Sequence, residues 1–265
     1  MTLLEPGLPP VYRLVRYDTV GSTNDEAKCL ARAGAKEWTL VWALEQTAGR
    51  GRQGRAWVSP RGNLYASLIL RPDCSIGQTA QLGFVAALAV GDTVSAIFEP
   101  FHGLAFKWPN DVLLRGRKVA GILLESESRQ GKDPEFVVIG IGINLVSSPT
   151  ATEFPATSLA EQDLGQMSPG EALEEFARHF CTCARRWRED GFAPIRMAWL
   201  ARAMSLGELI RVRLGSAVLH GRFVDIDQHG ALLLESAGEF RRVAAGEVFP
   251  VTPLTRSYAP RDQRQ

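Results

Sequence analysis

The stretch from Phe136 to Leu145, which reads FVVIGIGINL, constrains the fold of this chain more than any other. It is apolar almost without interruption, which is the pattern of a strand buried on both faces of a sheet. Gly140 and Gly142 leave one side of this strand without side chains, as happens where a ligand lies against a sheet. The stretch therefore predicts a central strand with packed layers around it and a binding surface on one side.

Further segments predict the rest of this sheet and its helices. Strand patterns occupy residues 13–17, 39–44, 64–70, 111–115 and 118–126. Helical patterns occupy residues 23–33, 78–98, 169–191 and 195–203. Thr23 with Glu26 and Ser168 with Glu171 form capping-box signals, and a tight turn is expected at Gly116–Arg117. We expect an α/β (α+β) fold in which helices flank a mixed sheet.

The pattern changes near Ser205. From there onward come short alternating strands, separated by turns that contain glycine: LIRVRL, AVLHGRFVDI, ALLLE, FRRV and VFPV. Five short strands in about fifty residues indicate a small β-barrel. We therefore expect two domains, residues 1–204 and residues 205–265.

A cationic, glycine-rich segment lies between two of the predicted strands. Residues 45–63 read EQTAGRGRQGRAWVSPRGN and combine four glycines with four arginines and one large aromatic residue, Trp57. Glycines let the backbone fold closely around a ligand, and arginines are permanently charged planar donors that suit phosphate or carboxylate. The segment is typical of an anion-binding lid, although a solvated basic surface loop has the same composition. Because its arginines repel one another, we expect it to be poorly ordered until an anion binds.

The same segment contains the letters of a dinucleotide-binding fingerprint. Residues 49–54 have its Gly-x-Gly-x-x-Gly spacing, and Asp73 stands about where the fingerprint places its acid. That motif requires a helix directly after the glycines. Pro60 and Gly62 would break such a helix, so a nicotinamide or flavin site is disfavoured.

Polar residues at the ends of other elements add further candidates. The run Ser22–Asn24 lies at the start of a predicted helix, where hydroxyl and backbone N–H groups can face a ligand, although simple capping explains the same residues. The KWPND run at 107–111 lies at a strand end, and Lys118 follows the hairpin turn. A lysine with asparagine and aspartate nearby suits phosphate and metal handling, and a surface hairpin with charged edges is the alternative.

Charge and cysteine content limit the class of protein. The net charge of +1 argues against a general nucleic-acid binder, because the basic character is local to the glycine-rich segment. The four cysteines form no Cys-x-x-Cys pair, which fits a reducing compartment. With no secretory leader and no apolar run long enough for a bilayer, we expect a cytoplasmic protein without membrane contact.

Taken together, these blocks closely resemble the biotin protein ligases (biotin–acetyl-CoA-carboxylase ligases). The resemblance rests on GSTN at 21–24, QTAGRGRQGR at 46–55 with Trp57, KWPND at 107–111, RKVAGIL at 117–123 and GIGIN at 140–144. The motifs are highly specific, follow the family's order and extend over residues 15–250.

The resemblance implies a mixed α/β catalytic domain followed by a small SH3-like β-barrel. It implies ATP-dependent conversion of biotin to biotinyl-5′-adenylate with Mg²⁺, then transfer of biotin to a lysine of the biotin carboxyl carrier protein. Some members carry a DNA-binding helix-turn-helix before the first strand, and there is no room for one ahead of Arg13. We therefore expect a single-function ligase that does not bind DNA, as a monomer or homodimer. Lipoate–protein ligase and a non-catalytic biotin or nucleotide sensor are the alternatives.

The same resemblance assigns the site residues. Residues with catalytic roles at the carboxylate, phosphate and metal are Arg52, Lys118, Asn110 and Asp111. Residues that contact biotin are Ser22, Thr23, Asn24, Gln46, Gly49, Arg50, Trp57 and Gly121. Residues that contact the nucleotide are Arg52, Arg55, Trp57, Lys107, Asn110, Lys118 and Asn144. Magnesium would accompany the ATP phosphates, and no ligand set is assigned to it.

Overall fold

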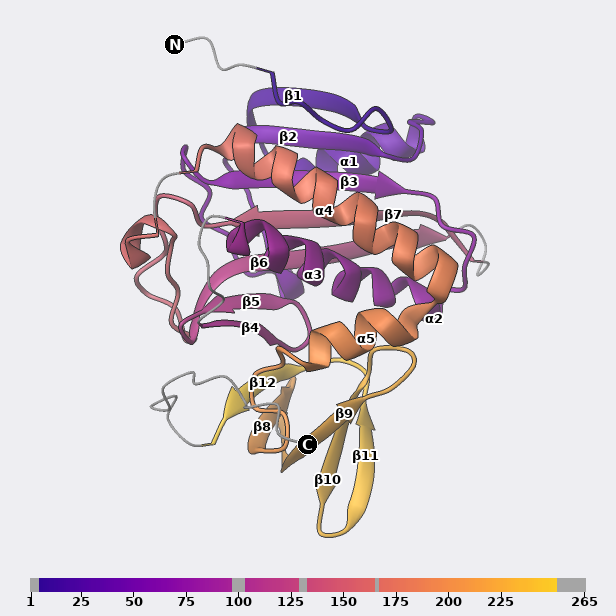
Figure 1. The fold of residues 1–265 in the computed structure, drawn as a ribbon, viewed down its shortest axis with the longest axis vertical. Coiled ribbons are helices and arrows are strands. Elements are labelled where there is room, and N and C mark those ends of the chain that lie inside the picture. The colour runs from indigo at the N-terminus through magenta and orange to yellow at the C-terminus, as the bar shows by residue number, and fades with distance from the viewer. Residues whose placement is uncertain (1–4, 97–102, 129–132, 165–166, 252–265) are drawn as a thin grey trace.

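The computed structural model describes residues 5–96, 103–128, 133–164 and 167–251. Its larger sheet has seven strands in the order β1-β2-β3-β7-β6-β5-β4 (Figure 1). These strands are β1 (Arg13–Val20), β2 (Thr39–Gln46), β3 (Leu64–Leu70), β4 (Leu104–Lys107), β5 (Asp111–Leu114), β6 (Arg117–Ser128) and β7 (Pro134–Ile143). β1 runs parallel to β2, whereas the other neighbours run antiparallel, so the sheet is mixed as predicted.

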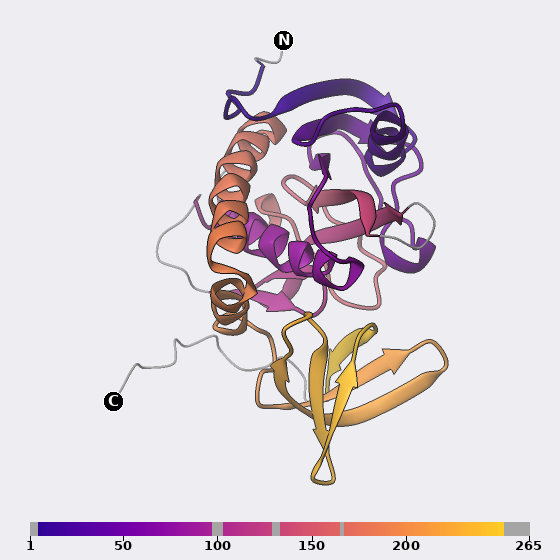
Figure 2. The same ribbon diagram turned by 90° about the vertical axis from the view of Figure 1, so that its right-hand side faces the viewer.

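Helices cover both faces of this sheet. They are α1 (Thr23–Arg32), α2 (Ile76–Thr79), α3 (Gln81–Ser95), α4 (Pro169–Asp190) and α5 (Phe192–Leu200). α3 and α4 lie against one face, and α1 lies against the other, where it contacts β2, β3 and β7 (Figures 1 and 2). The central strands are therefore buried on both sides, which confirms the interpretation of the apolar run at 136–145.

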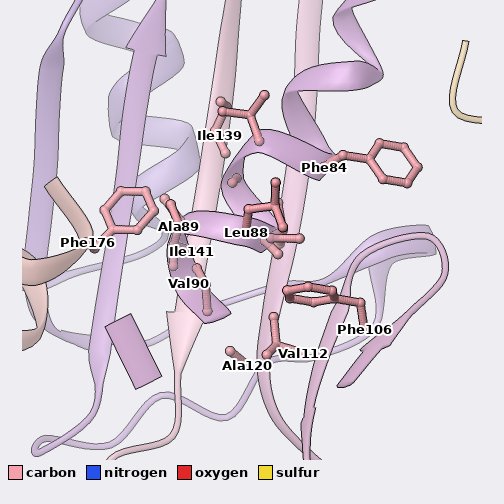
Figure 3. Packing of buried hydrophobic residues seen from close by; sticks show 14 of the residues in the cluster. Phe84, Leu88, Ala89, Val90, Phe106, Val112, Ala120, Ile139, Ile141 and Phe176 are labelled. Atoms are coloured by element: carbon pink, nitrogen blue, oxygen red, sulfur yellow. The ribbon is translucent and has the colours of Figure 1, made fainter. Parts of the chain in front are cut away.

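Strand β7 contributes to both layers. Ile139 and Ile141 belong to the large core under α3 and lie near Leu88 (Figure 3). Val138 belongs instead to a smaller cluster with Ala27 of α1. Successive side chains of a strand point to opposite faces, so one strand can line two environments of different character.

Helix α4 begins and ends where the sequence predicts. The Ser168 hydroxyl accepts a hydrogen bond from the Glu171 backbone N–H at 3.3 Å, and the Glu171 carboxylate accepts one from the Ser168 N–H at 2.8 Å. Pro169 occupies the first turn, where its missing N–H costs nothing. The helix stops at Gly191, whose φ of 75° favours glycine.

The predicted capping box of the first helix is wrong. Ser22, one residue earlier, is the N-cap of α1 and makes no side-chain capping bond. Thr23 is already inside the helix, and its hydroxyl donates to Gln46 on β2 at 3.1 Å. The Thr23 hydroxyl therefore bonds to a residue of another element instead of capping its own helix.

Two further predictions are corrected in detail. The hairpin turn before β6 is formed by Arg115 and Gly116, with φ of 49° and 75°, one residue earlier than expected. Two consecutive positive φ values are the geometry of a tight two-residue hairpin. The helix expected over 78–98 is divided into α2 and α3, and residues 97 and 98 lie outside the described part of the chain.

The C-terminal part of the chain forms a second, five-stranded antiparallel sheet in the order β11-β10-β9-β8-β12. Its strands are β8 (Leu209–Leu214), β9 (Ala217–Ile226), β10 (Leu232–Ser236), β11 (Glu239–Val243) and β12 (Glu247–Pro250). All five coincide with the predicted short strands to within one or two residues. The expected division after residue 204 falls between α5 and β8 and stays a prediction.

The turn between β9 and β10 attaches this sheet to the larger domain. The buried Trp108 indole N–H donates to the carbonyl of Gly230 at 2.9 Å, and the Gln81 side chain donates to that of Gln228 at 2.8 Å. A side chain at Gly230 would come within 2.5 Å of the Phe84 ring. This close contact holds the second sheet beside the KWPND segment, so residues of β12 lie near that segment.

Candidate active site

A cavity of about 470 Å³ lies on the α1 side of the larger sheet, between β6, β7 and the segment 45–63, which we call the arginine loop. The predicted site residues that line it are Ser22, Thr23, Asn24, Gln46, Arg50, Arg52, Arg55, Trp57, Lys107, Asn110, Asp111, Lys118, Gly121 and Asn144. Motifs that are far apart in the sequence therefore meet at one place.

Gly49 is the exception, because it does not line the cavity. Its backbone is folded into the loop, where the Gly49 carbonyl accepts from the Trp57 N–H at 2.8 Å. A side chain there would lie 2.5 Å from the Ser59 hydroxyl and 2.6 Å from the Trp57 carbonyl. Gly49 thus lets the loop close on itself, and its predicted direct contact with biotin stays a prediction.

Glycines form the floor of the cavity. Gly121 on β6 and Gly142 on β7 are directly paired, and the Trp57 ring lies over both. A Cβ on Gly142 would be 2.6 Å from this ring, and one on Gly121 would be 3.1 Å from it. A Cβ on Gly140 would be 2.2 Å from the Asn24 side-chain oxygen. The bare side of β7 predicted from the sequence is therefore covered by two side chains that belong to the site.

A buried charge cluster forms one end of the cavity. The Asp111 carboxylate lies between two ammonium groups, 2.6 Å from Lys118 Nζ and 3.3 Å from Lys107 Nζ. Burial by itself raises the pKa of Asp111, but Lys118 and Lys107 outweigh it and hold that pKa below its usual range. Two lysines share one carboxylate, so the cluster carries a net positive charge that suits an anionic ligand.

Aromatic rings surround these ammonium groups. Lys107 Nζ lies 4.8 Å from the centre of the Phe154 ring and 5.6 Å from that of Phe249. Lys118 Nζ lies 5.1 Å from the centre of the Trp57 ring. The rings stabilise the cations and keep bulk water away from them, which strengthens their attraction for an anion.

Arg52 reaches the same end of the cavity from the arginine loop. It donates to the Gly246 carbonyl at 3.1 Å and to the Asn110 side-chain oxygen at 3.4 Å. Burial lowers the pKa of the Arg52 guanidinium, and the Asp111 and Glu247 carboxylates oppose that change. An arginine keeps its charge under such conditions, so Arg52 adds a third cation next to the two lysines.

The second sheet completes this end of the cavity, which the sequence did not predict. Gly246 accepts from Arg52, Glu247 pairs with Arg55, and Phe249 lines the wall beside Lys107. Burial raises the pKa of Glu247, but hydrogen bonds from Arg55 and Arg213 hold it below its usual value. The short run GEVF carries no recognisable motif, so only the docking of the two sheets reveals its role.

The opposite end of the cavity is polar, its groups are already oriented, and the charge of Arg50 there is paired with Asp25 and Glu125. The Gln46 side-chain oxygen accepts from the Thr23 N–H at 2.8 Å and from its hydroxyl at 3.1 Å. The Gln46 amide nitrogen donates to Ser59 at 3.0 Å. The fully buried Ser67 hydroxyl lies 2.8 Å from that of Thr23 and 2.6 Å from the Asn24 oxygen. Ser67, also missed by sequence reasoning, fixes this set from behind.

The expectation that the loop arginines repel one another is wrong for most of them. Arg50 pairs with Asp25 of α1 and Glu125 of β6, while Arg55 pairs with Glu247. Arg61 lies 3.5 Å from Glu45. Carboxylates from α1, β2, β6 and β12 thus neutralise charges that look unbalanced in the sequence.

Both ends of the arginine loop are fixed to the sheet. At the first end, the Gln46 N–H donates to the Ser59 carbonyl at 3.2 Å. At the second, the Asn63 side-chain oxygen accepts from the N–H groups of Leu145, Val146 and Ser147. The single turn of 3-10 helix at 52–54 is followed by irregular chain up to β3, so no dinucleotide-binding helix follows the glycines.

Asn144 is buried, and its amide donates to the Thr157 carbonyl at 3.0 Å, so it also holds the chain at 155–159 against β7. Among the described residues no three His, Cys, Asp or Glu side chains are grouped as a metal site. The same part of the chain has no helix long and apolar enough to cross a membrane.

Comparison with known proteins identifies the class to which this fold and cavity belong. The Biotin/lipoate A/B protein ligase family matches residues 8–201, and the Biotin protein ligase C terminal domain matches residues 205–249. The chain belongs to this family of ligases.

Within the family its similarity is to biotin ligases, which confirms the resemblance seen in the motifs. It is 46% identical over 233 residues to the biotin–[acetyl-CoA-carboxylase] ligase of Paracoccus denitrificans, covering 86% of this chain and 96% of that protein. It is 35% identical over 235 residues to the enzyme of the same name from Mycobacterium tuberculosis, covering 86% and 85%. A biotin protein ligase from Aquifex aeolicus, solved with biotin and ATP, matches with a TM-score of 0.76 at 27% identity, covering 89% and 97%.

Proposed function

We propose that this chain is an ATP-dependent biotin protein ligase. It activates biotin as biotinyl-5′-adenylate and transfers the biotinyl group to a lysine of a biotin carboxyl carrier protein. One observation carries the proposal: a single cavity joins a polar end at Thr23 and Gln46 to a cationic end at Lys107, Lys118 and Arg52. Biotin has the matching pattern, a polar ureido ring at one end and a carboxylate at the other.

The first step needs positioning more than acid–base chemistry. A biotin carboxylate oxygen attacks the α-phosphorus of ATP, and the bond from that phosphorus to the pyrophosphate leaving group breaks. The carboxylate is already a nucleophile, so the main obstacle is bringing two anions together. Lys118 and Arg52 neutralise both, and because their positions are fixed before the reaction they stabilise the transition state at little cost in reorganisation.

The second step breaks the mixed anhydride. The carrier lysine, as a free amine, attacks the acyl carbon, AMP leaves, and an amide forms with loss of one proton from the nitrogen. Until the carrier arrives, water must be kept from the acyl carbon. Trp57 and the arginine loop cover the glycine floor and serve this purpose.

Magnesium fits the site as a companion of ATP and not as a resident metal. Mg²⁺ is usually held by one or two carboxylates together with substrate phosphates. Asp111 and Glu247 both line the cationic end, so they would hold such an ion beside the phosphates, with Asn110 nearby. When bound, the ion offsets the negative charge of the phosphates.

The polar end of the cavity also bears on the main rival function. Lipoate offers an aliphatic dithiolane that has no partners for Thr23 and Gln46, whereas the biotin ureido group has both donors and acceptors. This favours a biotin ligase over a lipoate ligase. The intact cluster of Lys107, Asp111 and Lys118 favours an enzyme over a sensor that only binds biotin.

The decisive experiment is incubation of the purified chain with ATP, Mg²⁺, biotin and an apo carrier domain. Mass spectrometry should show the gain of one biotinyl group on the carrier and none when ATP is left out. Binding of biotin without pyrophosphate release would instead indicate a sensor. We further propose that the enzyme is cytoplasmic, which its free cysteines support. We also propose that it does not bind DNA, which its net charge of +1 supports. A sequence-dependent, salt-resistant gel shift would contradict the latter.

A further inference from the structure

Glu125 on β6 lies outside the residues that line the cavity, yet three side chains from α1 and the arginine loop converge on its carboxylate. Asn24 of α1 donates to it at 2.7 Å, Lys28 of α1 at 3.1 Å, and Arg50 of the arginine loop at 3.0 Å. No motif used above includes this residue. A strand, a helix and the loop over the cavity are therefore joined at one side chain.

Arg50 transmits this arrangement to the cavity. Its guanidinium bridges Glu125 and Asp25 and also donates to the Ser22 hydroxyl at 3.2 Å. Because Ser22 accepts from Arg50, the proton of the Ser22 hydroxyl stays available for a ligand. Placing the guanidinium thus sets the direction in which a residue of the cavity wall can donate.

Asn24 is oriented by the same carboxylate. Its amide nitrogen donates to Glu125, and its oxygen lies 2.6 Å from the Ser67 hydroxyl, so the two ends of the amide cannot exchange without losing both bonds. Gly140 provides the space that Asn24 needs against β7. Glu125 therefore orients two residues at the polar end of the cavity, Arg50 from the loop and Asn24 from α1.

We propose that Glu125 is a positioning residue for biotin capture, holding Arg50 and Asn24 so that the arginine loop closes on α1 in one defined arrangement. This inference rests on the proposed function. The charge of Glu125 is essential to it, because charge-assisted hydrogen bonds are about twice as strong as neutral ones. The effect should fall on biotin binding and leave the cationic, nucleotide end of the cavity unchanged.

The chain provides a matched control for a purely structural role. Glu127 lies two residues further along β6 and pairs with Arg32 of α1, so it joins the same strand and helix. It touches neither Arg50 nor Asn24. If an ion pair between β6 and α1 were all that mattered, Glu125→Gln and Glu127→Gln would behave alike.

Steady-state biotin-dependent pyrophosphate exchange tests the proposal, with biotin and ATP varied separately in wild type, Glu125→Gln and Glu127→Gln. We expect Glu125→Gln to raise the KM for biotin by about 10-fold, from the loss of charge-assisted bonds, with the KM for ATP and kcat within about 2-fold of wild type. Glu127→Gln should match wild type in all three. Equal biotin KM values for Glu125→Gln and wild type, or equal increases in both variants, would overturn the proposal.

A double-mutant cycle tests whether Glu125 acts through Arg50. In an Arg50→Gln background, Glu125→Gln should raise the biotin KM by clearly less than it does alone, because the partner has already been removed. The same factor in both backgrounds would refute the link. Failure of wild type to release pyrophosphate would disprove the proposed function itself. An active wild type whose biotin KM is unchanged by Glu125→Gln would disprove only this inference.

Discussion

The two faces of the seven-stranded sheet are built from the same strands and are chemically opposite. On β7, Ile139 and Ile141 face the apolar layer under α3 and α4 (Figure 3). Gly140 and Gly142 face the other way, toward Asn24 and Trp57. The first face is dry and closely packed, and the second carries a cavity edged with charge. A period of two residues lets one strand supply stability on one side and chemistry on the other.

The neighbouring strand β6 has the same two kinds of face. Ala120 and Ile122 of β6 belong to the core, whereas Gly121 and Glu125 lie on the side of the cavity and α1. Changes on the α3 face should therefore affect stability, and changes among the cavity residues of the other face should affect catalysis. Each of the following predictions tests that separation.

The largest expected effect concerns the choice of substrate at the polar end of the cavity. Lipoate should support pyrophosphate release at least about 10⁴-fold less efficiently than biotin, because Thr23 and Gln46 would be left facing an apolar ring. The measurement is kcat/KM for each acid in the same exchange assay. Comparable kcat/KM values for the two acids would mean that the polar groups do not determine which acid is used.

Next in size is the loss of a cation from the buried cluster. Lys118→Ala should slow adenylation by about 10²-fold or more, because one fixed positive charge is removed from a site that gathers two anions. Its thermal stability should fall as well, because the buried Asp111 carboxylate keeps only Lys107 as a partner. Lys36→Ala, remote from the cavity, is the control and should be indistinguishable from wild type in single-turnover adenylate formation.

A reciprocal pair of core and cavity variants tests the separation most directly. Ile139→Ala should lower the free energy of unfolding by about 3 kcal/mol, as expected for a fully buried side chain, and leave the biotin KM unchanged. Gly142→Ala should raise the biotin KM by roughly 10-fold, because the new methyl group displaces Trp57. Chemical denaturation of both variants measures the free energy of unfolding, and pyrophosphate exchange measures the biotin KM. A large shift in KM for Ile139→Ala would show that the faces are coupled.

The smallest predicted effect is a pH dependence of stability at Glu125. Burial raises the pKa of this carboxyl, but Asn24, Lys28 and Arg50 bring it below the ordinary value of 4.5. The resulting stabilisation is complete above about pH 4.5 and is lost as the pH falls through the lowered native pKa. The Tm of wild type should exceed that of Glu125→Gln by roughly 2 °C at pH 7, and the gap should shrink in acid.

Ile139→Ala supplies the control for this pH series, because no titrating group is removed. Its Tm difference from wild type should stay constant between pH 7 and acid. A Glu125→Gln gap that is just as constant would mean that the carboxylate does not contribute through its charge.

How far the sequence predicts this molecule depends on whether the signal is local. The strand β7 and the helix α4 follow from patterns within about twenty residues, and both were predicted correctly. The cavity residues followed from motifs carried by the family. Glu125, Ser67 and Glu247 were missed, because each acts through a partner brought near only by the fold. The repulsion expected among the arginines failed for the same reason, since Asp25, Glu125 and Glu247 are remote from them in sequence.

The anchoring of Asn63 has a consequence for the entropy of ligand capture. Its single side-chain oxygen ties the end of the arginine loop to three consecutive N–H groups after β7, while Gln46 ties the beginning. Because the Gln46 N–H also holds Ser59, only residues 47–58 gain or lose freedom when the loop opens, so the segment that biotin must immobilise is shorter than the whole loop. Loss of the Asn63 hydrogen bonds would lengthen the mobile segment and weaken biotin binding, although Asn63 is not among the residues that line the cavity.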